Sequence, residues 1–280
     1  MEINGWQYYN HAAIPTCAPH ETPDLTPVKS GAIWKLSGRP LLARWTTDFD
    51  CGTETSWWYV IKDTPFDISQ LKAKRRYEIN KGIKNFRVSR LRTPQDYASE
   101  IADVQAEAFS AYPAKYRPVV DKESFAQGIS AWQRDDIYVY GAFSREDGRL
   151  CGYAYLREEA EAVHFYVLKT RPDSEKSGVN AALVCGILED FREKLMHGSY
   201  ISDGARSIYH ETAFQDYLEK YFGFRKAYCY LRVKYNPMVA GLVVLLHPFK
   251  HLLKKLDSVG IVHKINSLLR MQEFAQGKKI

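Results

Sequence analysis

The sequence is poor in the features that mark secreted and membrane-spanning proteins. It has only five cysteines among 280 residues, an odd number, and none forms a Cys-x-x-Cys pair. This excludes a disulfide framework and predicts reduced, mostly buried thiols of the kind found in cytosolic proteins. The longest aliphatic run, residues 239–246, has eight residues, whereas a helix that spans a bilayer needs about 20.

Familiar site motifs are also scarce. The first ten residues have neither a basic start nor an apolar stretch, so no secretory signal is expected. The chain contains no Gly-x-Ser-x-Gly elbow, no Walker loop and no dinucleotide fingerprint. His247 and His251 have the i, i+4 spacing of zinc ligands on a helix, but no third ligand is evident in the sequence. We therefore expect no metal site.

Positive charge is concentrated in two zones. The chain has 39 Lys and Arg against 33 Asp and Glu, a net charge of +6. Residues 69–92 hold nine basic residues against one acidic residue, Glu78, and residues 236–280 hold seven against two. Such zones on an otherwise acidic chain are typical of surfaces that meet phosphates or anionic lipid headgroups. Solvated helix faces are the alternative.

Three regions of different character follow one another along the chain. Residues 1–66 are rich in Trp, Tyr, Pro and Thr and predict a β-rich lobe, with strands over 32–36, 41–46 and 56–62. Residues 67–235 predict an α/β domain. Residues 236–280 predict basic amphipathic helices, which either pack on the domain or lie on a membrane surface.

The middle region alternates between helix and strand periodicity. Helices are expected over 70–84, after Pro94, and over 122–132, 180–195 and 212–222, the last ending at Gly223. Strands are expected over 86–91, 137–144, 149–158, 163–169, 199–204 and 224–235. Strands that alternate with helices in this way predict an α/β sheet.

The loop before the helix at 180–195 is a candidate anion site. It contains Arg171 and Lys176, and Gly178 opens the helix. The free N–H groups of a helix start and the helix dipole favour a phosphate, and a glycine allows close approach of the backbone. An ordinary N-cap by Ser177 or Asn180 is the alternative.

Three segments resemble the GNAT superfamily and, more narrowly, its Fem-type branch of FemABX-like proteins from cell-envelope and polysaccharide loci. They are SQLKAKRRYEINKGIKNFRV, KSGVNAALVCGILEDF and ISDGARSIYHETAFQDYLEKYFGFRKAYCYLRV. The resemblance covers about residues 66–235. It implies a GNAT-like mixed central sheet flanked by helices, and transfer of an acyl group from a thioester or ester to an amine.

The resemblance further implies acyl-CoA, first of all acetyl-CoA, as the donor, with its pyrophosphate on the loop and helix start. The residues matching this cofactor position are Leu168, Lys176, Ser177, Gly178, Val179 and Asn180. Glu175 and Asn180 depart from the usual loop pattern, which keeps open an aminoacyl-tRNA donor, as in Fem-type ligases. The tyrosine that acts as the acid in GNAT enzymes is replaced here by Glu219.

Acyl transfer needs a base for the nucleophile and a donor for the carbonyl oxygen. A backbone N–H near Tyr166 is the candidate donor. Asp203, His210 and Glu158 are candidate bases. Asp203 and Arg206 follow a strand at its carboxyl end, where open α/β sheets bind ligands, although a simple turn is the alternative.

Arg75 and Arg76 in the basic helix are candidates for binding a phosphate-bearing substrate or tRNA by salt-dependent attraction. Three functions follow from these observations. The first is an N-acyltransferase acting on an amino group of a small or lipid-linked envelope precursor, such as an amino sugar. The second is a tRNA-dependent ligase of the Fem type, and the third a non-catalytic GNAT-like binding protein. A cytoplasmic location is expected, with residues 236–280 as a candidate contact to the inner face of the plasma membrane.

Overall fold

The computed structural model describes residues 3–114, 117–208, 213–257 and 259–277. The chain forms two compact units. Unit 1 consists of Met1–Val60, Ala205–Ala213 and Lys226–Ile280, and unit 2 of Ile61–Gly204 and Phe214–Arg225. The predicted middle region therefore contributes to both units.

Unit 2 is built on a mixed sheet with the strand order β9-β8-β7-β6-β5. Its strands are β5 (Phe86–Arg90), β6 (Ile137–Ser144), β7 (Leu150–Glu159), β8 (Ala162–Thr170) and β9 (Tyr200–Ala205). Neighbours from β5 to β8 are antiparallel, and β8 and β9 are parallel. Parallel neighbours need a long crossover connection, and a helical segment provides it here.

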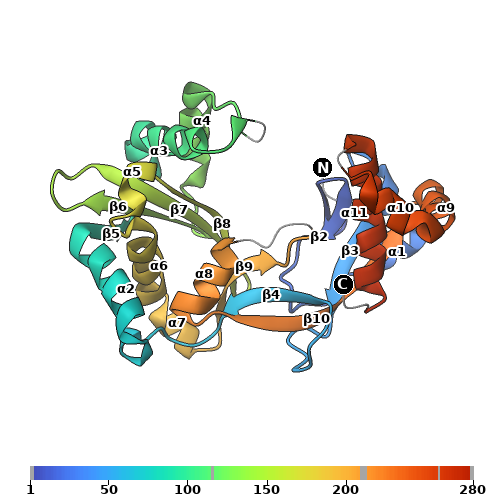
Figure 1. Ribbon diagram of the computed structural model, residues 1–280, viewed down its shortest axis with the longest axis horizontal. Helices are drawn as coiled ribbons and strands as arrows, with labels where there is room; N and C mark the ends of the chain where they lie inside the picture. The colour runs from blue at the N-terminus through green and yellow to red at the C-terminus, as the bar shows by residue number, and fades with distance from the viewer. Residues whose placement is uncertain (1–2, 115–116, 209–212, 258, 278–280) are drawn as a thin grey trace. The chain divides into compact units, whose positions relative to one another are not determined.

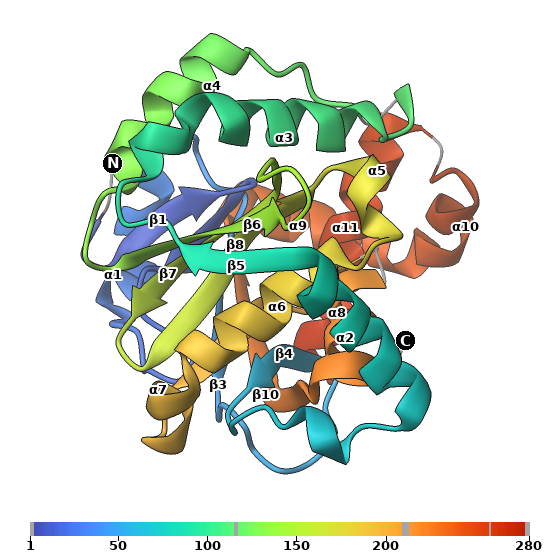
Figure 2. The same cartoon turned by 90° about the vertical axis from the view of Figure 1, so that its left-hand side faces the viewer.

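Helices cover both faces of this sheet (Figures 1 and 2). On one face lies α3 (Ala98–Ser110), beside α4 (Lys122–Gly128), and on the other lie α2 (Ala73–Asn85) and α6 (Val179–Asp190). The helix α3 packs through one apolar stripe, whereas α6 is buried along most of its length. These two layers hold β8 in a rigid frame.

Shorter elements complete unit 2: η2 (Ile68–Gln70), η3 (Pro94–Tyr97), η5 (Ile129–Trp132), α5 (Pro172–Glu175), α7 (Arg192–Met196) and α8 (Ala213–Phe222). The helix α8 ends before Gly223, whose φ of 68° confirms the predicted glycine terminus. The predicted helix over 180–195 is divided between α6 and α7 at Phe191.

Unit 1 contains the strand order β1-β2-β3-β10-β4. The strands are β1 (Trp6–Tyr9), β2 (Ala12–Pro15), β3 (Leu42–Thr47), β4 (Trp57–Lys62) and β10 (Arg225–Tyr235). The pairs β1–β2 and β3–β10 are antiparallel, and β2–β3 is parallel.

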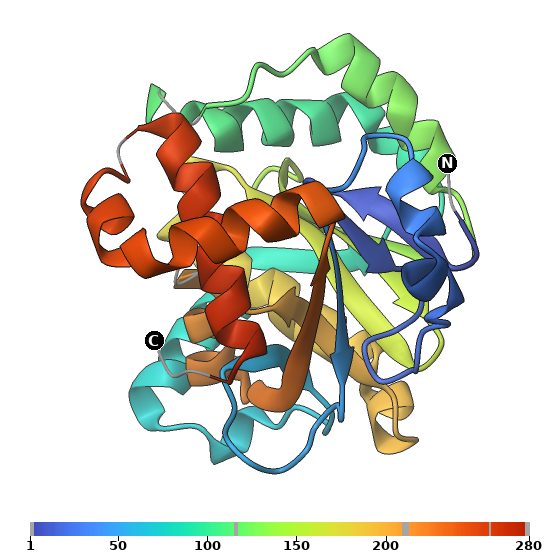
Figure 3. The ribbon, with the colours of Figure 1, turned by 90° about the vertical axis from the view of Figure 1, so that its right-hand side faces the viewer.

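The helical elements of unit 1 come from both ends of the chain (Figure 3). They are α1 (Thr26–Ser30), η1 (Ala32–Lys35), α9 (Pro237–Leu246), η6 (His247–Phe249), α10 (Lys250–Lys255) and α11 (Gly260–Ala275). Met271 and Phe274 of α11 pack against Trp57 and Leu231 of the sheet. Part of the C-terminal region thus belongs to the core of this unit.

The strands expected over 41–46 and 56–62 are confirmed as β3 and β4, whereas the strand expected over 32–36 is wrong. That segment is the 3-10 helix η1. Gly31, with a φ of 78°, ends α1 in the left-handed conformation and leads the chain directly into the next helical turn. Ile33 and Leu36 are nevertheless buried, which accounts for the apolar pattern.

Candidate functional site

The parallel pair β8–β9 opens partway along its length. Ala162, Val163 and His164 pair with Tyr200, Ile201 and Ser202, and among the described residues the pairing ends there. Both strands continue, β8 to Thr170 and β9 to Ala205. The edge of β8 beyond His164 therefore presents backbone groups that no described strand of the sheet covers on that side.

The first part of this open edge contains a β-bulge. Phe165 pairs with Leu156 and Val167 with Tyr155, so Tyr166 is an extra residue without a partner in β7. A bulge re-aims the backbone of its strand locally and releases it from the regular ladder. We therefore expect an N–H group in this segment to be available to a ligand. Tyr166 is 54% exposed, and its ring meets that of Tyr155 edge-on.

Asp203 lies directly after Ser202, at the same opening of the sheet. Burial raises the pKa of its carboxyl from 3.8 to about 7, and a hydrogen bond from Gln215 opposes this rise. The amide of Gln215, on α8, also donates to the backbone oxygen of Asp203 at 3.3 Å. A carboxyl group with a pKa near neutrality is suited to general acid–base catalysis.

Aromatic side chains of α8 lie beside the open strand. The rings of Phe165 and Phe214 are 6.2 Å apart, and Phe214 in turn stacks on Tyr217. Burial raises the pKa of Tyr217 well above its usual range, so its hydroxyl stays protonated at neutral pH. These rings reduce the access of water to the β8 side of the opening.

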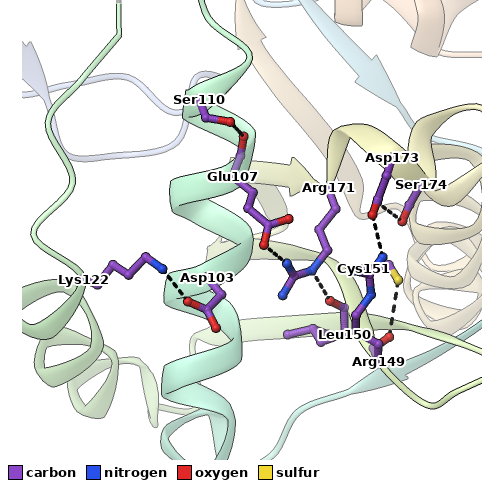
Figure 4. A network of polar contacts seen from close by, with 10 residues as sticks. All are labelled: Asp103, Glu107, Ser110, Lys122, Arg149, Leu150, Cys151, Arg171, Asp173 and Ser174. Atoms are coloured by element: carbon purple, nitrogen blue, oxygen red, sulfur yellow. Dashed lines mark hydrogen bonds and ion pairs between the residues drawn. The ribbon is translucent and has the colours of Figure 1, made fainter.

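Two cations in and beside the predicted anion loop are already engaged, and Figure 4 shows the contacts of one of them, Arg171. Arg171 is 6% exposed, donates to the backbone oxygen of Leu150 at 2.8 Å and forms an ion pair with Glu107 of α3. Lys169 donates to the hydroxyl of Tyr112 at 2.8 Å. Both side chains therefore tie β8 to the α3 region, and this geometry leaves them poorly placed to receive a phosphate.

The start of α6 is held against α2. Lys81 donates to the backbone oxygen of Lys176 at 2.8 Å, and the amide of Asn85 donates to that of Ser177 at 3.0 Å. The side chain of Asn180 accepts a bond from Thr170 at 3.2 Å. The expected N-caps are therefore absent from this helix start: Asn180 braces β8, and Gly178 occupies the N-cap position without a side-chain bond.

Of the remaining residues predicted for the cofactor position, Val179 is buried and Leu168 is partly buried on β8. Arg75 and Arg76 lie on α2. Arg75 packs over the ring of Tyr221 at 5.7 Å, and Arg76 donates to the backbone oxygens of Ser69 and Leu71. The role of these residues in binding stays a prediction.

The other predicted catalytic residues have hydrogen-bond partners of their own or lie outside the described residues. Arg206 belongs to unit 1, where it donates to the backbone oxygen of Ser56 at 2.8 Å. Glu158 accepts hydrogen bonds from Lys194 and Tyr138. His210 lies outside the described residues. Tyr166 and Asp203 thus lie on the neighbouring strands β8 and β9 of unit 2, each beyond the last residue pair of the two strands.

Two features of this site leave no signal in the sequence. The bulge depends on the register of β8 against β7, and Gln215 reaches Asp203 from a separate helix. Within the described residues there is no group of three or more His, Cys, Asp or Glu able to hold a metal ion. Nor does any described helix combine the length and hydropathy that a transmembrane span requires.

Comparison with known proteins identifies relatives by structure alone. No family model and no curated protein matches the sequence. The C-terminal domain of a putative lysylphosphatidylglycerol synthetase from Agrobacterium fabrum has a TM-score of 0.52 and 12% identity, covering 86% of this chain and 82% of that one. L-PGS from Bacillus licheniformis has a TM-score of 0.51 and 12% identity, and the match covers 86% of this chain and 83% of that chain. FemX has a TM-score of 0.47 and 10% identity, covering 72% and 74%.

At such low identity these likenesses report on the fold. The expectation of a mixed α/β sheet flanked by helices is confirmed, and the assignments to the GNAT superfamily and to its Fem-type branch stay predictions. Many functions occur on one fold, so the chemistry has to be argued from the site. The chain shares the fold of these solved structures, and in it the pairing of β8 with β9 ends before a backbone bulge on β8 and a buried carboxyl group on β9.

Proposed function

We propose that unit 2 catalyses acyl transfer, moving an acyl or aminoacyl group from an activated ester or thioester to an amine or hydroxyl nucleophile. The observation that carries this proposal is the opening between β8 and β9, with the bulge at Tyr166 on one strand and Asp203 on the other. Acyl transfer needs a donor for the carbonyl oxygen and a base for the nucleophile, and we assign these roles to a backbone N–H of the bulge and to Asp203.

The proposed reaction has two linked steps. The nucleophile attacks the carbonyl carbon of the donor, Asp203 takes the proton of the nucleophile, and a backbone N–H of the bulge stabilises the oxyanion. The carbonyl then re-forms, the bond to the leaving oxygen or sulfur breaks, and the leaving group recovers a proton. A pKa of about 7 allows Asp203 both to accept and to return that proton near neutrality.

For the donor we favour an aminoacyl ester carried by tRNA. The surface of α2, which adjoins the start of α6, exposes Lys74 and Lys84, and Lys72 precedes it. Such a row of cations attracts a polyanionic backbone without reading its bases. Glu175 in the neighbouring loop disfavours a compact pyrophosphate. The two solved structures described above with TM-scores above 0.5 carry names that refer to lysylphosphatidylglycerol synthetase or L-PGS.

The second candidate donor is acyl-CoA, with N-acyl transfer to an amino sugar or another envelope amine. It is favoured by Gly178, which precedes α6 with a φ of 89° and opens a helix of 12 residues. A helix start of this kind offers backbone N–H groups to a phosphate. The acetyl group is the first choice because it demands least room.

For the acceptor we propose a molecule at an anionic membrane surface, which residues of unit 1 would contact. Val244 and Leu245 on α9 are 75% and 67% exposed, and Leu252 on α10 is also exposed. Lys254 and Lys255 end α10. Apolar side chains beside cations suit the boundary between acyl chains and anionic headgroups. Membrane contact would place a lipid acceptor within reach of the protein.

The decisive experiment compares donors and a matched pair of variants. The full chain receives either radiolabelled lysyl-tRNA or radiolabelled acetyl-CoA, with phosphatidylglycerol vesicles or glucosamine as acceptor. We expect transfer from lysyl-tRNA, and Asp203→Asn should lower the rate by about 100-fold or more, the usual contribution of a general base. Asp216→Asn, on an exposed position of α8, serves as the control.

Three outcomes would contradict the proposal at different levels. Transfer from acetyl-CoA alone would replace the favoured donor with the second one and leave the site intact. A folded Asp203→Asn protein with the same rate as the Asp216→Asn control would remove Asp203 from the mechanism. Absence of transfer for all four donor and acceptor pairs would favour the non-catalytic binding function.

A further inference from the structure

A second cavity lies entirely within unit 1. Its volume is about 510 Å³, and it is bounded by the β1–β2 turn, by β3 and by α11. This size falls in the range of small-molecule sites, about 300 to 1,000 Å³. Most of its lining is apolar, and its aliphatic contributors include Leu41, Leu42, Ile208, Leu268 and Met271. The acyl-transfer proposal makes no use of this cavity.

One lining residue, Arg44, is a cation in largely apolar surroundings. It belongs to β3, and its guanidinium lies 6.0 Å from the ring centre of the fully buried Trp57. Burial lowers the pKa of Arg44, opposed by the hydroxyls of Tyr59 and Tyr9. Among the described residues no carboxylate forms an ion pair with it. A guanidinium withdrawn from water without an anion is costly, and a bound anion would offset that cost.

The charge around the cavity has one sign. Lys264 of α11 and His11 of the β1–β2 turn also line it, and none of the described lining residues is Asp or Glu. Asn10 and Ser267 add neutral polar groups to the lining. The cavity therefore combines aliphatic walls with a cationic side, and its described lining lacks a group that would repel an anion.

We propose that this cavity binds an amphiphilic anion, with an aliphatic chain against Leu42, Leu268 and Met271 and a carboxylate or phosphate head on Arg44. The planar guanidinium binds either head through paired hydrogen bonds. A purely polar anion such as inorganic phosphate would leave the aliphatic walls unfilled, and a neutral hydrocarbon would leave Arg44 unpaired. The ligand class comprises free fatty acids and single-chain lipid phosphates, and it does not depend on the transfer reaction.

Calorimetric titration of the full chain distinguishes these possibilities. The probes are dodecanoate, dodecyl phosphate and dodecanol, each below its micelle-forming concentration, with inorganic phosphate as a fourth. We expect both amphiphilic anions to bind, and dodecanol and inorganic phosphate to bind at least about tenfold more weakly, since a hydrogen bond to a charged group and the burial of a chain are each worth that much. The anion that binds with the higher affinity identifies the class of natural ligand: a free fatty acid if it is dodecanoate, a lipid phosphate if it is dodecyl phosphate.

Three variants test the assignment of residues. Arg44→Gln removes the cation and should lower the affinity for dodecanoate at least about tenfold. Ser267→Phe fills the cavity from α11 and leaves Arg44 unchanged. It should lower the affinity for both amphiphilic anions. Arg232→Gln is the control, because Arg232 is exposed on the adjacent strand β10, opposite Trp45. Binding of dodecanol as tight as that of dodecanoate, or unchanged affinity in a folded Ser267→Phe protein, would overturn the proposal.

Discussion

Gly82 of α2 lies in van der Waals contact with Gly178 at the start of α6. A Cβ atom added to Gly178 would come within 2.9 Å of the Cα of Gly82, closer than side chains tolerate. Together with the bonds from Lys81 and Asn85, this contact joins α2 to the loop that precedes α6. The basic helix and the predicted anion loop thus form one surface of unit 2.

The substitution Gly82→Ala should destabilise the protein. Its new methyl group would collide with the backbone of Gly178, and overpacking of this kind costs about 1 to 3 kcal/mol. Thermal unfolding followed by circular dichroism measures the loss. Gly128→Ala is the control, since a Cβ atom at that position would meet no other atom within 4 Å and the helical position favours alanine. Equal melting temperatures for the two variants would contradict the close contact.

Asp203 should make stability and activity depend on pH in opposite directions. Its pKa is about 7 in the folded protein against 3.8 ordinarily, so the neutral form is favoured by folding. This stabilisation is complete below about pH 4 and is lost as pH rises through 7. Asp203→Asn should therefore raise the melting temperature relative to the natural protein by more at pH 8 than at pH 4.

The transfer rate follows the ionised form of the same group. It should rise with pH to a plateau, with a midpoint near 7, if Asp203 accepts the proton of the nucleophile. Initial rates between pH 5 and 9 test this. A midpoint at pH 4, or an identical profile for a residual activity of Asp203→Asn, would show that another group controls the reaction.

The ion pair between Arg171 and Glu107 should contribute more to the stability of the fold than the ion pair between Lys122 and Asp103. Both carboxylates lie on α3. Arg171 is buried and Glu107 is half exposed, so Glu107→Gln leaves a buried cation poorly compensated, at a cost of about 1 to 2 kcal/mol. Lys122→Gln breaks the exposed pair with Asp103 and should change stability by less than about 0.5 kcal/mol. Urea denaturation ranks the two variants. The reverse order would mean that Arg171 gains little from Glu107.

Arg206 should contribute to the packing of unit 1. Its guanidinium lies 4.2 Å from the ring centre of Trp58 and 4.3 Å from that of Phe274. Arg206→Ala removes both contacts and the bond to Ser56, and should cost about 2 kcal/mol, with Arg232→Ala on the exposed face of β10 as the control. A stable Arg206→Ala protein that has lost transfer would instead support the catalytic role that the sequence predicts.

Membrane contact through α9 should be sensitive to charge on its exposed face. The double variant Val244→Glu, Leu245→Glu places two carboxylates where the proposal puts lipid, and should abolish sedimentation with phosphatidylglycerol vesicles. Val119→Glu changes a fully exposed valine of unit 2 and should sediment like the natural protein. Undiminished sedimentation of the double variant would exclude α9 as the contact.

Sequence periodicity is sufficient for most elements of unit 2. The strands β6 to β9 and the helices α2, α3 and α8 fall where apolar spacing and turn residues predict them, as does β10 of unit 1. The same spacing does not predict the hairpin β1–β2, and it assigns the segment over 32–36 to the wrong element. Short segments of four or five residues carry too few periods to separate strand from helix.

The candidate site was predictable only as a region. Asp203 is named by its position near the end of a strand and Tyr166 as part of a strand that offers a backbone N–H, but the bulge requires the register of Phe165 and Val167 against β7. The contact that engages Arg171 joins residues 64 positions apart. From the sequence alone, a cation in a loop is expected to be free to bind an anion. Whether a carboxylate from another element already pairs with it is known only from the tertiary structure.

The sequence by itself determined most strands and helices of unit 2, the two basic zones and the GNAT-like resemblance, because these depend on local spacing and composition. Only the tertiary structure decided that the pKa of Asp203 is near 7, that Arg171 is committed to α3, and that Arg44 faces an apolar cavity. Burial and pairing set the energy of a charge, and both arise from residues distant in the chain.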